Sequence, residues 1–347
     1  FRLSKFEGVY YKHHGCAKKM PVLFDLDEDL LTFLGLWLAD GCYDKASVIL
    51  SVVEEENREI LRNLSKKYSF NIKMHSDTFS LMANSSSFRK IMKEVFGLKG
   101  NSYTKRIPEW VFSLSNKQIS YVLKGIFSGD GCVSDKEIVM PLSSLNMLKD
   151  VQLLLLRFGI IFRIGKFRKD KTYNSNISTV RDWKLFKKYI GILPKHKKER
   201  LDLLCDKIST HCSTDVIPLV MEDKKKLCSM VGDLSHNDYV SRRNIVGRRK
   251  LNSVLQETVV ENEFLKNVVA LSKSDLLWDQ VKEIKKIDFE GYVYDVSVPE
   301  DESFVVDNIV AHNTLELPVE KLRKLGYNVQ PMKVRAAMTK ATSEMAA

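Results

Sequence analysis

Phe33-Leu-Gly-Leu-Trp-Leu-Ala-Asp-Gly41 and Leu123-Lys-Gly-Ile-Phe-Ser-Gly-Asp-Gly131 are two related stretches that lie 90 residues apart in this chain. Each ends an apolar segment whose repeat of three and four residues predicts a helix. In both, the helical pattern stops at one carboxylate followed by Gly. A repeat of this size, present in two copies, indicates a pseudo-twofold domain rather than a solenoid.

Small residues occupy matching places in the two predicted helices. Gly35 and Ala39 lie four apart in the first, and Gly125 and Gly129 lie four apart in the second, so each pair shares one helix face. Because these faces lack bulky side chains, the two helices are expected to pack with their backbones nearly in contact.

Such packing would bring Asp40 and Asp130 together at the helix ends. Paired carboxylates bind Mg²⁺, which activates water and stabilises the leaving oxygen in phosphodiester hydrolysis. The spacing alone leaves a structural alternative open, since Asp-Gly after an apolar helix is a common helix stop.

The order of predicted elements repeats with the acids. The first half has a helix, a strand, a helix, a hairpin and a helix, at 28–39, 47–53, 54–68, 71–75 with 79–82, and 85–96. The second half has the same order, at 117–129, 137–140, 146–158, 160–167 with 176–180, and 182–190. Residues 104–111 are predicted to be a loop because Pro108 resists both regular states.

The net charge of +11 is concentrated in one segment. Residues 161–200 contain thirteen Lys or Arg and three Asp or Glu, with aromatic residues interleaved. This composition favours a polyanionic partner such as nucleic acid, the alternative being a solvated basic face.

No run is long enough to span a membrane and no signal peptide is evident, so a cytoplasmic location is expected. The six cysteines form no C-x-x-C pair and are expected to be reduced.

The paired stretches resemble the dodecapeptide motifs of the LAGLIDADG homing endonucleases over about residues 23 to 200. The first matches at the Gly, Leu, Ala, Asp and Gly positions, and the second at the first Leu, the Gly, the Asp and the final Gly. Departures are Lys124 at a usually small position, and Leu38 and Ser128 where an acid is frequent. The resemblance implies an α+β fold of two αββαββα halves, 23–112 and 113–200, whose sheets bind double-stranded DNA, acting as a monomer.

The resemblance also implies a catalytic site. It assigns divalent metal, expected to be Mg²⁺, to the helix ends formed by Asp40, Gly41, Asp130 and Gly131. Thr104-Lys-Arg-Ile-Pro resembles a lysine-containing block of the family, which implies that Lys105 polarises the attacking water or neutralises phosphate. Lys197 is the matching candidate in the second half, and for both lysines a plain phosphate contact is the alternative.

A second chemistry is indicated by Val310-Ala-His-Asn-Thr314. The Asn313 side-chain amide can attack its own carbonyl carbon and release the following residue, and His312 can supply a proton. The Thr314 hydroxyl can serve as a nucleophile. The tripeptide alone is weak evidence, since a surface His-Asn-Thr is common.

The setting of this tripeptide resembles the two C-terminal blocks of inteins. These blocks are Gly291-Tyr-Val-Tyr-Asp-Val-Ser-Val-Pro299, in which Asp295 is implied to tune the splice chemistry, and 303–314. Glu302 stands near a position that is His in many inteins. No Cys or Ser nucleophile with its His block precedes Pro21, so the chain is expected to begin inside the splicing domain or in the linker after it.

These observations divide the chain into five segments. Residues 1–22 are a linker or a remnant of an N-terminal splicing region, 23–200 the endonuclease, and 201–272 a basic helical insert that contacts DNA or is a solvated spacer. Residues 273–313 are the C-terminal part of an all-β Hint splicing domain, and 314–347 a host segment (C-extein) that vaguely resembles secretion-type ring ATPases.

The predicted function is site-specific double-strand cleavage in intein homing, combined with Asn cyclisation. The alternatives are a cleavage-inactive DNA-binding passenger and a fragment of an intein-interrupted secretion-type ATPase.

Overall fold

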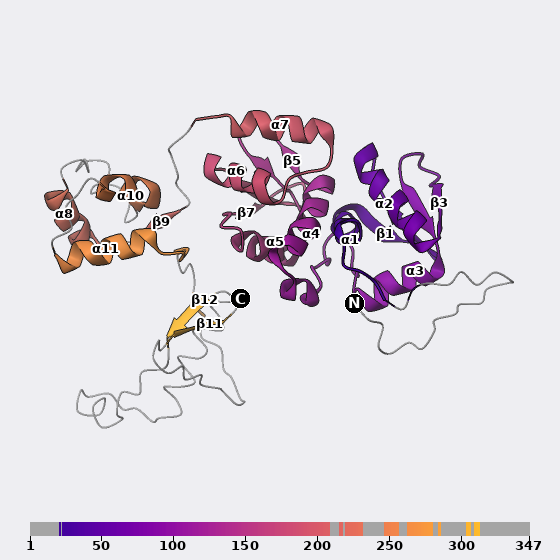
Figure 1. Cartoon of the computed structure of the whole chain (residues 1–347), viewed down its shortest axis with the longest axis horizontal. Helices are drawn as coiled ribbons and strands as arrows, with labels where there is room; N and C mark the ends of the chain where they lie inside the picture. Colours follow the sequence, from indigo (N-terminus) through magenta and orange to yellow (C-terminus); the bar gives the residue numbers. More distant parts are fainter. Residues whose placement is uncertain are drawn as a thin grey trace, which may run out of the picture. The chain divides into compact units, whose positions relative to one another are not determined.

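A computed structural model describes residues 21, 23–208, 215–217, 219–231, 246–256, 262–279, 284–285, 303–306 and 309–312 (Figure 1). The chain forms two compact units, Phe1–Ser274 and Asp275–Ala347. Among the described helices, none has the length and apolar character needed to cross a bilayer.

The first half of the larger unit has the order αββαββα and contains one four-stranded sheet, β1-β2-β4-β3. All neighbouring strands in this sheet are antiparallel. The element bounds are α1 Glu28–Asp40, β1 Gly41–Tyr43, β2 Ser47–Leu50, α2 Glu55–Tyr68, β3 Asn71–Met74, β4 Leu81–Asn84 and α3 Ser86–Lys90. Helix α1 begins where the Asp27 side chain accepts a hydrogen bond from Leu30 N, and one π-helical segment, Ile91–Val95, continues α3.

The second half repeats this order, and its sheet has the equivalent strand order, β5-β6-β8-β7. Its element bounds are α4 Asn116–Gly129, β5 Cys132–Val133, β6 Ile138–Val139, α5 Leu145–Leu156, β7 Arg163–Phe167, β8 Tyr173–Ile177 and α6 Val180–Tyr189. Ser115 and Gln118 form a capping box that starts α4. A 3₁₀-helix, Glu109–Ser113, follows Pro108 within the segment predicted to be a loop.

The predicted repeat of elements is confirmed. The pattern of residues did not indicate the short strand at each Asp-Gly, which only the resemblance to αββαββα halves implied. Strands β1 and β5 are three and two residues long, too short to show an alternating pattern. They are fixed by pairing with the next strand, as in Gly41 opposite Leu50. The strand predicted at 47–53 ends at Leu50. Ser51 N still donates to Asp40 O, the next pair in the β1–β2 register, but Asp40 is already the last residue of α1.

Helices α1 and α4 form the centre of the fold (Figure 1). A Cβ atom built on Gly35 would lie 2.1 Å from Val122 O, and one built on Gly125 would lie 2.1 Å from Thr32 O. Each glycine would also place its Cβ 2.9 Å from the Cα of the other. The two backbones are therefore in direct contact, as the spacing of small residues predicted, and no side chain fits at the crossing.

The outer strands of the two sheets expose most of their side chains. In β3 three of four residues are exposed, and in β7 four of five are. By contrast, all four residues of β2 are buried. The buried faces join the central helices in one hydrophobic core, so the exposed outer strands are available for contact with a partner.

The segment after the second half is helical, as predicted, and also contains a small antiparallel pair of strands. Its elements are α7 Lys195–Cys205, β9 Val216–Ile217, α8 Met221–Met230, β10 Val246–Gly247, α10 Arg248–Gln256 and α11 Glu263–Lys273. Helix α7 crosses the boundary predicted at residue 200. We call residues 215–274 the insert.

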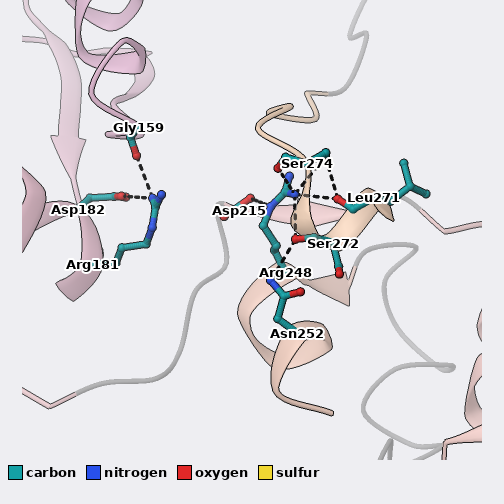
Figure 2. A network of polar contacts seen from close by, with 9 residues as sticks. All are labelled: Gly159, Arg181, Asp182, Asp215, Arg248, Asn252, Leu271, Ser272 and Ser274. Carbon is teal, nitrogen blue, oxygen red and sulfur yellow. Dashed lines mark hydrogen bonds and ion pairs between the residues drawn. The ribbon is translucent and has the colours of Figure 1, made fainter. Parts of the chain in front are cut away.

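Arg248 is the central polar residue of the insert (Figure 2). Its Nε donates to Asp215 Oδ1 at 2.8 Å, and its Nη1 donates to the carbonyls of Leu271 and Ser274, both at 2.8 Å. Both side chains of the Arg248–Asp215 ion pair are only 11% exposed. Arg248 belongs to a basic stretch, residues 241–250, for which phosphate contact and a solvated loop are the two interpretations from the sequence. This arginine is instead used to join α10, α11 and the start of β9, and residues 241–245 lie outside the described part.

In the described part of the smaller unit, β11 Ser303–Val306 pairs antiparallel with β12 Ile309–His312. Alternating apolar and polar residues predict strands at 303–306 and 309–311, which the hairpin confirms. The same pattern predicts strands at 281–287 and 291–298, which lie almost entirely outside the described residues, as do the N-terminal linker and the predicted host segment.

Replacing Gly125 by Ala is expected to lower the free energy of unfolding by about 3 kcal/mol or more, because the new methyl group meets backbone atoms of α1. Urea unfolding would measure this. Gly191→Ala is the control: at φ 70° with no atom within 4 Å, it is expected to cost only roughly 1–2 kcal/mol of backbone strain. Equal losses in the two variants would contradict backbone contact between the helices.

Candidate active site

Asp40 and Asp130 lie at the same end of the central helix pair. Asp40 is the last residue of α1, and Asp130 caps the C-terminus of α4. The place that a Cβ of Gly129 would take is 3.3 Å from Asp40 Oδ2 and 2.5 Å from Ala39 Cβ. Because Gly129 has no side chain, the end of α4 comes close to the Asp40 carboxylate.

The two carboxyl groups influence each other's proton affinity. The pKa of Asp130 is raised to about 7. Burial is the main cause of this rise, and the negative charge of Asp40 is the second. Burial also raises the pKa of Asp40, while Lys105 and Lys197 lower it in part. Both acids also lie at helix C-termini, where the backbone dipole is negative. The site therefore favours a proton or a cation between the carboxylates.

Lys105 holds the C-terminal end of α1. Its Nζ donates to Trp37 O at 2.9 Å, Ala39 O at 3.0 Å and Gly41 O at 2.8 Å, and lies 4.8 Å from the centre of the Trp37 ring. A lysine ammonium has three donors, and all three serve carbonyls at the C-terminal end of α1. Trp37 O accepts a second bond there, from the backbone N–H of Gly41. Lys105 is 7% exposed, and this burial lowers its pKa.

Lys197 holds the C-terminal end of α4. Its Nζ donates to Ser128 O at 2.8 Å and to Gly129 O at 2.9 Å. Each lysine segment is also held by the opposite half of the domain. Lys105 O accepts from Ser144 Oγ, and Lys195 N donates to Glu56 Oε1. The roles predicted for these lysines, polarising the attacking water or neutralising phosphate, stay predictions. The hydrogen bonds of both ammonium groups go to backbone carbonyls.

Glu54 is a third acid at this site, and the sequence analysis did not select it. Its charge raises the pKa of Asp40 and also acts on Lys197. Glu54 precedes α2 and accepts a hydrogen bond from Asn57 Nδ2, which also donates to Ser128 O. It is the first of three consecutive glutamates, a run that gives no signal of its own in the sequence.

The donor atoms at the helix ends are the kind that Mg²⁺ binds. They are carboxylate oxygens, and Mg²⁺ is usually bound by one or two carboxylates that share it with water and phosphate oxygens. Within the described residues, no cluster of three or more His, Cys, Asp or Glu side chains forms a closed metal cage. Gly41 O already accepts a bond from Lys105, so the Asp40 and Asp130 side chains are the better candidates for holding the ion.

A profile of the intein splicing domain matches residues 79–313, which is more than half of the chain. The chain belongs to the intein splicing domain family. The match begins within the first αββαββα half, after β3, and ends at Asn313.

Proteins with unrelated names contain segments similar to this intein. A glutamine–fructose-6-phosphate aminotransferase of Methanocaldococcus jannaschii is 28% identical over 89% of this chain and 29% of its own length. An RNA polymerase subunit Rpo1C of the same organism is 29% identical over 86% of this chain and 37% of its own length. A replicative helicase DnaB of Synechocystis is 28% identical over 64% of this chain and 28% of its own length. The intein thus spans about a third of the length of the relatives it matches.

Solved structures similar to this intein include a complex of I-DmoI and two structures of WhiA. I-DmoI in complex with DNA and Mn is 16% identical, with 48% of this chain and 97% of that chain covered at a TM-score of 0.38. The N-terminal LAGLIDADG domain of WhiA is 19% identical, with 48% and 84% covered at 0.36. Full-length WhiA from Thermatoga maritima is 14% identical, with 72% and 90% covered at 0.39.

The predicted splice residues of the intein are only partly described. His312 is the last residue of β12, and its backbone pairs with Ser303. Asn313, Thr314 and Asp295 lie outside the described residues, so their assignment stays a prediction.

Without divalent metal, the free energy of unfolding is expected to fall as the pH rises from about 4 to about 7. The reason is that the folded state binds the Asp130 proton more tightly than the unfolded chain, whose carboxyl has its ordinary pKa of 3.8. Urea unfolding in EDTA at pH 5 and pH 8 would measure a loss on the order of 3 kcal/mol. Asp130→Asn should remove most of this loss and Asp135→Asn, at an exposed acid, should not; a loss unchanged in Asp130→Asn would contradict the raised pKa.

Proposed function

We propose that this intein carries a metal-dependent, site-specific DNA endonuclease that cuts both strands of a duplex. The observation that supports it best is the carboxylate pair, Asp40 and Asp130, held at one end of two helices in backbone contact. Fold and core stability do not require two partly buried acids at negative helix ends, so this placement favours a functional role.

The two sheets are the proposed DNA-binding surfaces. They have the same strand order and expose their outer strands, and β7 presents Arg163, Lys166 and Phe167 to solvent. Two-stranded and larger β-ribbons fit the major groove, where basic side chains contact phosphates and guanine. Six to ten phosphate contacts would make log affinity fall with log salt at a slope on the order of −5 to −9.

The proposed chemistry divides among a few residues. Mg²⁺ held by the two carboxylates would activate water and stabilise the leaving oxygen of the scissile phosphodiester. Asp40 and Asp130 are kept close by the glycine face of the helices, and their mutual repulsion is relieved when a cation is bound. Lys105 and Lys197 fix the helix ends that carry these acids and add positive charge beside them.

We also propose that the intein was inserted into a host protein and uses Asn313 for C-terminal splicing chemistry. Similar segments make up about a third of an aminotransferase, a polymerase subunit and a helicase, a pattern that suits an element inserted into unrelated hosts. The family match ends at Asn313. In the proposed step the side-chain amide nitrogen of Asn313 attacks the backbone carbonyl carbon of Asn313, the peptide bond to Thr314 breaks, and a succinimide forms. His312 gives a proton to the leaving amine, and the proton that the attacking nitrogen loses restores the balance.

Asp130→Asn and Asp40→Asn are each expected to reduce cleavage of duplex DNA carrying the uninterrupted host gene by on the order of 1,000-fold in Mg²⁺, because each removes a metal-binding carboxylate. Plasmid linearisation would measure it. Glu28→Gln is the matched control, since it removes an exposed acid from the opposite end of α1. Full activity in either Asp variant would contradict the assigned site, and binding without cleavage by the unaltered chain would favour the passenger alternative.

Asn313→Ala is expected to abolish release of the segment that follows residue 313, because alanine has no side-chain amide to attack the carbonyl. Intact-mass spectrometry after prolonged incubation at raised temperature would detect release. Asn308→Ala, five residues earlier, is the control, and release that persists in Asn313→Ala would contradict the proposed chemistry.

A further inference from the structure

Helix α10 of the insert has two clearly different faces. Leu251, Val254 and Leu255 are 0%, 6% and 6% exposed and form part of the core of the insert. Of the polar side chains, Arg248 and Asn252 contact other parts of the insert, and the others are exposed. The exposed residues on this helix are Arg249, Lys250, Ser253 and Gln256.

Two polar residues, four apart, hold α10 in place. Arg248 joins it to Asp215 and to the C-terminal carbonyls of α11, and Asn252 Nδ2 donates to Ser272 O at 3.0 Å (Figure 2). Arg248 N also donates to Asp215 O. The helix is therefore fixed by its own polar contacts along one side, and its exposed side is presented in a defined orientation within the insert.

The exposed side is cationic and contains no acid. None of the nine residues of α10 is Asp or Glu, whereas α8 has Glu222 and Asp223 in its first turn and α11 has Glu263. The charge of Arg248 is paired with Asp215, so Arg249 and Lys250 supply the outward charge. An anionic partner would meet no repelling carboxylate on this helix.

We propose that α10 is a DNA-reading helix that enters the major groove beside the sequence bound by the two sheets; this inference rests on the endonuclease proposed above. Arg249, Ser253 and Gln256 are spaced as i, i+4 and i+7 and so form one stripe. Arg pairs with guanine, Gln pairs with adenine, and a serine hydroxyl bonds to either kind of base edge. The stripe is about 10 Å long, and a helix with its side chains is about 10–12 Å across, which fits a major groove about 12 Å wide.

The helix contributes both affinity and sequence preference. On a duplex without the preferred sequence, Arg249 and Lys250 both contact phosphates, and each neutralised phosphate adds about −0.9 to the salt slope. On the preferred sequence, Arg249 turns to the base edge and Lys250 keeps its phosphate. Ser253 Oγ donates to Lys250 O at 2.8 Å, which leaves its oxygen able to accept from a base amino group. Gln256, at the C-terminal end, has both a donor and an acceptor for a base.

The first test is duplex binding by the whole chain in EDTA, which prevents cleavage. Arg249→Gln with Lys250→Gln is expected to weaken binding to a random-sequence 40-base-pair duplex about tenfold and to reduce the salt slope by about 2. The matched control, Lys225→Gln with Lys266→Gln, removes two exposed lysines from α8 and α11 and is expected to change affinity less than twofold. Equal losses in both double variants, or none in the first, would overturn the inference.

The second test asks whether α10 reads bases. Binding sites selected from a randomised duplex library are expected to lose preference at one or two base pairs in Ser253→Ala with Gln256→Ala, by roughly 5- to 100-fold in discrimination. Identical selected sites would overturn base reading by this face. Hydrogen exchange of the α10 amides, unchanged in each variant, would show that the insert remains folded.

Failure of this inference can be separated from failure of the endonuclease. If the unaltered chain binds no duplex DNA, the endonuclease proposal fails with it. If it binds and cuts DNA while the α10 variants behave identically, only the role of α10 is overturned. An equal loss of binding to polyglutamate and to DNA in Arg249→Gln with Lys250→Gln would show a general anion surface and would also overturn it.

Discussion

The contact between the backbones of α1 and α4 is the constraint on which the rest of the larger unit depends. Gly35 and Gly125 leave no space between the helices for a side chain. Each half has a helix on one side of this contact and a four-stranded sheet that shares the common core. The distance between the helices thus fixes how far apart the two sheets and the two acids lie.

This contact has an electrostatic cost. It places two carboxylates, and the negative ends of two helices, in one partly buried place, which raises the pKa of Asp130 to about 7. The fold offsets part of that cost with Lys105 and Lys197, each inserted from a loop or helix start and each bonded to helix-end carbonyls. The remaining preference for positive charge is what makes the site suitable for a divalent cation.

Much of the fold could be predicted from the sequence, because the signals lie within single segments. The helices, the repeat order and the glycine contact follow from periodicity and from small residues four apart. Strands β1 and β5 could not be predicted from the pattern of residues, since two or three residues carry no pattern and their pairing depends on partners later in the chain. Only the family resemblance implied them. In the site, the two acids were predicted from motif matches, whereas Glu54 reaches Asp40 only through the packing of α2. The ion pair of Arg248 with Asp215 could not be predicted either, because the two residues are 33 positions apart and meet only in the folded insert.

The two halves share one contact but differ at their outer edges. Strand β3 is four residues long and pairs regularly with β4, whereas β7 is five residues long and its pairing with β8 is interrupted by an irregularity between Ile164 and Phe167. The two halves are therefore alike where α1 meets α4 and differ at their outer strands, β3 and β7. For the proposed endonuclease this means a target whose left and right arms differ in sequence, so the orientation of the protein on the duplex is set by which arm each sheet reads.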